Sequence, residues 1–80
     1  MKTDQAKLLI SANAIGDVVI VQREAGEYEV WLHLADDAAP VGNLRATLEV
    51  ARGGKRLFSS LDAAIAAVRR LGWLQSVIVE

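Results

Sequence analysis

The chain has 80 residues, of which 52% are hydrophobic and 24% charged, and its formal net charge is −1. This length allows a single domain over residues 1–80, and the absence of cysteine excludes a disulfide framework or a cysteine-based zinc site. No stretch approaches the ~20 apolar residues of a membrane-spanning helix, and no secretory leader is apparent, so a cytoplasmic protein is expected.

The apolar content and the charge distribution both favour self-association. A chain this short has a marginal core, and its apolar content exceeds what one small core hides. Acidic residues dominate positions 1–40 and basic residues dominate positions 41–80. A molecule with one acidic and one basic side could steer an anionic partner or pair with a second copy of itself, and we expect a homodimer.

The N-terminal segment favours a helix that is capped by Asp4 or Thr3 and runs to about Ile15, with Gly16 as its end. One face of this helix would carry apolar residues at the spacing i, i+4, i+7: Leu8, Ala12 and Ile15. A short strand over residues 8–10 is the alternative.

Residues 17–34 predict an antiparallel hairpin. Asp17–Arg23 is rich in β-branched residues, residues 24–27 contain the glycine of a turn, and Tyr28–Leu34 alternates between apolar and other residues. The alternation places four residues inward: Tyr28, Val30, Leu32 and Leu34. It places Glu29, Trp31 and His33 outward. Trp31 would lie under a loop or the first helix, or serve as an interface anchor.

Residues 35–42 have loop composition, and residues 44–51 alternate as a strand that would turn at Gly53-Gly54 into residues 55–58. A helix competes for residues 44–51. In the preferred strand, Leu44, Ala46, Leu48 and Val50 point inward.

A helix over residues 60–71 is the strongest pattern in the chain. Ser59 is the expected N-cap, Asp62 lies in the first turn, and Gly72 follows as the C-terminal residue with positive φ. The apolar stripe recurs at helical spacing: Leu61, Ala64, Ile65, Val68 and Leu71. A final apolar strand is predicted over residues 76–79.

The predicted fold class is therefore α+β. The element order is helix, three strands, a further short strand, helix and strand, forming an antiparallel three- to four-stranded sheet with its helices packed on one face. The helix face opposite the stripe has few long side chains, and it could approach a second chain closely. Together with the two tryptophans it gives the candidate interface: Trp31, Ala63, Ala66, Ala67 and Trp73.

The sequence offers little for catalysis, and we expect a non-enzymatic protein without a cofactor or metal. The only histidine is His33, no cysteine is present, and the serines lack any local mark of a nucleophile. His33 with Asp36 and Asp37 falls short of a metal-ligand set.

Five basic residues form the one candidate anion site. They lie around the predicted glycine turn and at the end of the second helix: Arg52, Lys55, Arg56, Arg69 and Arg70. Such residues can contact phosphates, so a small DNA- or RNA-binding module is the alternative function. The order helix, three strands, helix, with a glycine-lysine-arginine turn before an alanine-rich helix, resembles the topology of the double-stranded-RNA-binding fold.

A second resemblance covers residues 44–80. LEVARGGKRLFSSLDAAIAAVRRLGW resembles the strand, F-x-S-L-D-A-A, helix, L-G pattern of small partition-associated accessory proteins of plasmids and integrating elements. The resemblance implies an accessory role in mobile-element maintenance beside a larger partition or DNA-binding protein. The expected function is therefore a self-associating protein–protein interaction module.

Overall fold

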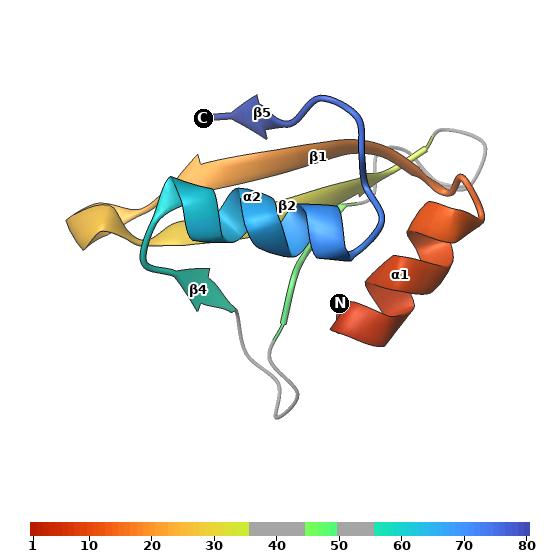
Figure 1. The fold of residues 1–80 in the computed structure, drawn as a ribbon, viewed down its shortest axis with the longest axis horizontal. Coiled ribbons are helices and arrows are strands. Elements are labelled where there is room, and N and C mark those ends of the chain that lie inside the picture. The colour runs from red at the N-terminus through yellow and green to blue at the C-terminus, as the bar shows by residue number, and fades with distance from the viewer. Residues whose placement is uncertain (36–44, 50–55) are drawn as a thin grey trace.

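The computed structural model describes residues 1–35, 45–49 and 56–80. Within them the chain forms two α-helices, a short 3₁₀ turn and five strands (Figure 1). In chain order these are α1 (Thr3–Ser11), β1 (Ile15–Gln22), the 3₁₀ turn (Glu24–Gly26), β2 (Tyr28–Leu34), β3 (Arg45–Thr47), β4 (Leu57–Phe58), α2 (Leu61–Arg70) and β5 (Ile78–Val79). The α+β class and the order of elements are confirmed.

The sheet is mixed rather than antiparallel. Its order is β3-β2-β1-β5, and β4 also pairs with β2, on the edge that β3 occupies. β2 is antiparallel to β1, β3 and β4, whereas β5 is parallel to β1. The antiparallel prediction fails at β5 because α2 runs opposite to β1, so the strand that returns from α2 has the direction of β1 (Figure 1).

β3 and β4 do not form the predicted hairpin. Both run antiparallel to β2, β3 opposite residues 31–33 and β4 opposite residues 28–29. Between them the Leu48 amide donates to the Val30 carbonyl (2.9 Å), and the Arg56 amide donates to the Leu48 carbonyl (2.9 Å). The two strands are therefore successive parts of one edge along β2. The predicted turn at Gly53-Gly54 and the loop at residues 35–42 lie largely outside the described residues.

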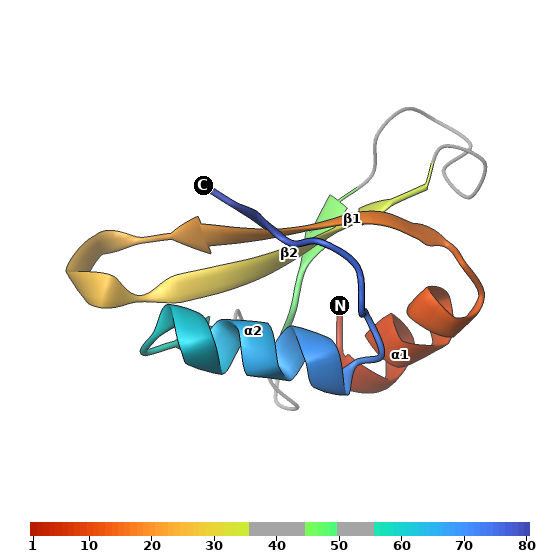
Figure 2. The ribbon, with the colours of Figure 1, turned by 45° about the horizontal axis from the view of Figure 1, so that its top comes forward.

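Both helices pack on one face of the sheet, as predicted (Figure 2). The core lies between the sheet and the two helices and contains side chains from both layers: Ala6, Ile15, Val18, Ile20, Val30, Leu32, Leu48, Phe58, Ala64, Ala67, Val68, Leu71 and Trp73. The inward alternation of β2 is confirmed, because Val30 and Leu32 are fully buried and Tyr28 and Leu34 pack against this core. Neither α1 nor α2 is long and apolar enough to span a bilayer.

The first helix is shorter than predicted. Its N-cap is Lys2, which makes no side-chain capping bond, and the helix ends at Ser11. The chain leaves the helix through Asn13, which has a left-handed φ of 58°. The Asn13 amide donates to the Ile10 carbonyl (3.1 Å) and the Ala14 amide to the Leu9 carbonyl (2.8 Å), the pair of bonds that defines a Schellman ending.

This early ending frees the next residues for the sheet. Ile15, predicted as the last residue of the helix, is instead the first residue of β1 and is buried. Leu8 was predicted on the apolar helix face and is 69% exposed.

The second helix is confirmed, with one shift at its start. The N-cap is Ser60 rather than Ser59, and its Oγ accepts from the Ala63 amide (3.1 Å). Gly72 has a φ of 100° and ends the helix as predicted.

We predict that Ser60→Ala lowers the free energy of unfolding by about 1 kcal/mol, the usual cost of losing a serine N-cap. Ser59→Ala is the matched control, because Ser59 is exposed and lies one residue before the cap. Urea unfolding of both variants measures the difference. A larger loss of stability in Ser59→Ala than in Ser60→Ala would show that Ser59, and not Ser60, is the N-cap.

Candidate interaction surface

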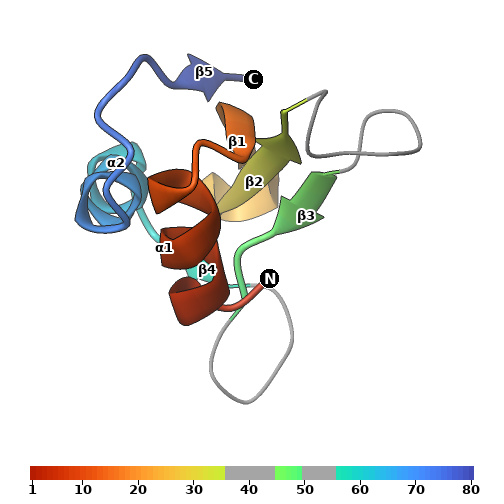
Figure 3. The same cartoon turned by 90° about the vertical axis from the view of Figure 1, so that its right-hand side faces the viewer.

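The sheet face that points away from α1 and α2 is the candidate site. We call it the open face, because no helix or strand of the described residues lies over it (Figure 3). The strand register defines its members. One row crosses four strands as Thr47, Trp31, Val19 and Ile78. A second row contains Leu57, Glu29 and Val21, and a third contains His33 and Asp17.

The middle of the open face is apolar and its exposure is uneven. Ile78 is 46% exposed and Leu57 is 48% exposed, whereas Trp31 is half-buried and Val19 is buried. The apolar side chains lie between Asp17 at the start of β1 and Arg23 just after its end. An apolar centre with charged residues at its rim is the usual anatomy of a protein–protein interface.

A buried carboxylate lies within this face. Glu29 was predicted to point outward, and it does lie on the face opposite the core, but it is only 2% exposed. Its Oε2 accepts a hydrogen bond from Trp31 Nε1 (3.0 Å), and its Oε1 lies 3.2 Å from Arg23 Nε. A buried carboxylate needs such partners, because desolvating an unpaired one costs several kcal/mol. The bond to Glu29 holds the Trp31 ring in place on the open face.

Trp31 does not lie under the first helix, because α1 packs on the other face of the sheet (Figure 3). The predicted loop over residues 35–42 lies largely outside the described residues, so a position under that loop and a role as an interface anchor both stay predictions.

The two ends of the molecule differ in charge. Beyond β1, the hairpin tip and the last residue line a shallow groove rich in acids: Gln22, Arg23, Glu24, Glu27 and Glu80. At the other end, α1 and the end of α2 line a groove with exposed Lys7, Leu8 and Arg70, together with Asp4 and Ser11. Figure 1 shows the hairpin tip and α1 at opposite ends of the long axis.

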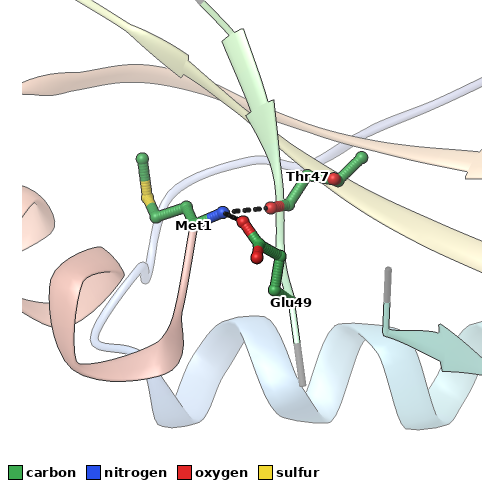
Figure 4. Close-up of polar contacts among 3 residues, drawn as sticks. All are labelled: Met1, Thr47 and Glu49. Carbon is green, nitrogen blue, oxygen red and sulfur yellow. Dashed lines mark hydrogen bonds and ion pairs between the residues drawn. The ribbon is translucent and has the colours of Figure 1, made fainter. Parts of the chain in front are cut away.

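Met1 is bonded to β3 and the residues just after it, at the edge of the sheet (Figure 4). The Met1 amino group donates to the Thr47 carbonyl (2.8 Å) and forms an ion pair with the Glu49 carboxylate. The Glu49 amide in turn donates to the Met1 carbonyl (2.7 Å). The hydrogen bond from the amino group and its positive charge lower the pKa of Glu49, burial opposes them by raising it, and Lys2 lowers it further.

The other predicted interface residues do not share one surface. Ala67 and Trp73 are buried in the chain's own core, Ala63 is half-buried, and only Ala66 is exposed. Ala67 is buried because the contact face of α2 is wider than the predicted stripe. Trp73 is held by a hydrogen bond from its Nε1 to the Ser76 carbonyl (3.1 Å).

The predicted basic cluster is not assembled in the described residues. Arg52 and Lys55 lie outside them. The Arg56 guanidinium lies 4.9 Å from the centre of the Phe58 ring, before α2 begins. At the other end of that helix, Arg69 donates to the carbonyls of Trp73 (3.0 Å) and Gln75 (2.6 Å), and Arg70 is exposed.

His33 is half-buried on the open face, opposite Asp17 in the register. Within residues 1–35, 45–49 and 56–80, no group of three or more His, Cys, Asp or Glu side chains could hold a metal ion. Asp36 and Asp37 lie outside these ranges.

Sequence reasoning missed Glu29 and the exposure of Ile78. The alternation of β2 gives the face of Glu29 but neither its burial nor its bonds to Trp31 and Arg23. The final strand was predicted from its continuous apolar residues, a pattern that does not tell which of them are exposed.

No protein-family model, curated protein or solved structure matches this chain.

We predict that Glu29→Ala lowers the free energy of unfolding by about 2 kcal/mol, because it leaves the half-buried Trp31 N–H without this acceptor and opens a gap. Glu29→Gln should cost less, since its amide oxygen can still accept from Trp31, and an ion pair with a half-exposed arginine contributes under ~1 kcal/mol. Urea unfolding of both variants compares them. Equal losses would show that the charge, not the hydrogen bond, matters.

We predict a pH-dependent effect of Glu49→Gln in a chain that starts at Met1. Because the pKa of Glu49 is lowered in the folded state, its ionised form stabilises the fold above the ordinary carboxyl pKa. This contribution is lost as the pH falls through the lowered pKa. The stability difference between wild type and Glu49→Gln should therefore be largest near neutral pH and vanish well below about pH 4. A difference independent of pH would contradict the ion pair.

Proposed function

We propose that this protein is a non-enzymatic protein–protein interaction module that associates with itself. The observation that carries the proposal is the open face, an apolar sheet surface with Trp31, Ile78 and Leu57 on it and no described helix or strand above it. A sheet with one apolar face needs one covering layer, and α1 and α2 provide it. Covering the second apolar face as well would bury more apolar surface and so lower the free energy of the protein.

The size of the open face bears on the strength of this association. Four strands about 4.8 Å apart and seven residues at about 3.3 Å each give a face of at most ~450 Å² in projection. Two such faces would bury roughly 900 Å² or somewhat more, which is small for a specific complex. The expected dimer is therefore weak, with dissociation in the micromolar range or above.

The accessory role in mobile-element maintenance stays a prediction that rests on the resemblance of residues 44–80. Nucleic-acid binding has less support, because Arg56 stacks on Phe58 and Arg69 bonds to backbone carbonyls at the far end of α2. Arg56 and Arg69 therefore lie at opposite ends of α2, and Arg52 and Lys55 lie outside the described residues.

Sedimentation equilibrium over about 1–500 μM should show a reversible monomer–dimer equilibrium, consistent with a small interface. Ile78→Asp should shift the equilibrium to monomer, because it places a charge in the apolar row of the open face. Leu8→Asp is the matched control, since Leu8 is exposed on α1, in the other layer. A wild-type chain that stays monomeric throughout this range would overturn the proposal.

A further inference from the structure

We propose that two copies pack open face against open face with their strands running in opposite directions. The two-fold axis lies along the row Thr47, Trp31, Val19 and Ile78. This arrangement rests on the proposed function, because it specifies the geometry of the self-association.

The row is suited to lie at the centre of such an interface. It crosses β3, β2, β1 and β5, so it passes through the whole width of the sheet. Trp31 lies within it and is held by its hydrogen bond to Glu29. A side chain that is already fixed loses little conformational freedom on binding, and tryptophan is among the residues that contribute most at interface centres.

The charges at the two ends of the molecule favour opposite strand directions. The hairpin end carries Glu24, Glu27 and Glu80 beside Arg23. Among the described residues, the other end carries Lys7, Arg69 and Arg70 together with the acids Asp4 and Asp17. Packing with parallel strands would place the two acidic ends together. Opposite directions place the acidic end of each copy beside the more basic end of the other.

The same geometry also closes the assembly. A two-fold axis along the row places Val19 opposite its own copy, Asp17 opposite Val21 of the other protomer and His33 opposite its Glu29. It also brings Asp17 of one protomer toward Arg23 of the other. The interface is therefore isologous and stops at a dimer, whereas head-to-tail contact between the acidic and basic ends would continue into a filament. The end charges lie partly beyond the ~10 Å screening length of 0.1 M salt, so they act mainly on orientation and at low ionic strength.

Cross-linking between single cysteines tests the arrangement, because the native chain contains no cysteine. Thr47→Cys and Ile78→Cys lie at the two ends of the row, three strand spacings or ~14 Å apart. Facing sheets are ~10 Å apart, so a short bis-maleimide reagent should link Thr47→Cys to itself and Ile78→Cys to itself. A mixture of the two variants should give no mixed product, because those positions would be roughly 17 Å apart.

The remaining outcomes each decide something. A mixed Thr47–Ile78 product with no self-linked product would show parallel packing and overturn the inference. Leu8→Cys is the control, and self-linking of Leu8→Cys at the rate of Ile78→Cys would place the interface on the helical layer instead. If the wild type dimerises but neither Thr47→Cys nor Ile78→Cys cross-links, the open face is not the dimer interface. A monomeric wild type would reject the proposed function itself.

Discussion

The position of β2 in the sheet is the constraint on which the structure depends. β1 pairs along one edge of β2, and β3 and β4 divide the other edge between them. Its alternation buries Val30 and Leu32 under the helices and turns Glu29 and Trp31 to the opposite face. One seven-residue strand therefore determines both the core and the composition of the open face. A shift of one residue in the register of β2 would move its core residues to the open face and its open-face residues into the core.

The ends of the two helices decide how the other strands reach β2. Asn13 ends α1 early enough for Ile15 to enter the sheet, and Gly72 turns the chain away from α2. Beyond Gly72, Arg69 donates to two backbone carbonyls and the Trp73 indole to a third. These bonds fix the segment that brings Ile78 beside Val19 on β1. The side chains of Arg69 and Trp73 thus hold the turn after α2 in the conformation that places Ile78 on the open face.

Local pattern was enough to predict most of the fold, and contacts between distant residues account for the rest. The hairpin, the second helix and Gly72 follow from residues close in sequence, since alternation, helical spacing and glycine act locally. The direction of β5 depends on how α2 crosses the sheet, and the burial of Glu29 depends on a partner beyond the turn. The choice between Ser59 and Ser60 depends on where the backbone becomes helical, and Ser60 still has extended torsions (φ −150°, ψ 157°). Of the candidate site, the face of Trp31 was predictable, whereas its hydrogen bond was not.

The Glu29–Trp31 hydrogen bond is difficult to explain by stability alone. Burying a carboxylate costs free energy that well-packed apolar side chains would not, and the half-exposed Arg23 offsets a part of that cost. The bond does, however, fix a large aromatic ring on a surface where apolar packing from above is absent in the described residues. A fixed ring presents one defined contact shape, whereas a free one would collapse onto its neighbours or move among rotamers. The hydrogen bond therefore gives the open face a defined shape, which the proposed self-association would require.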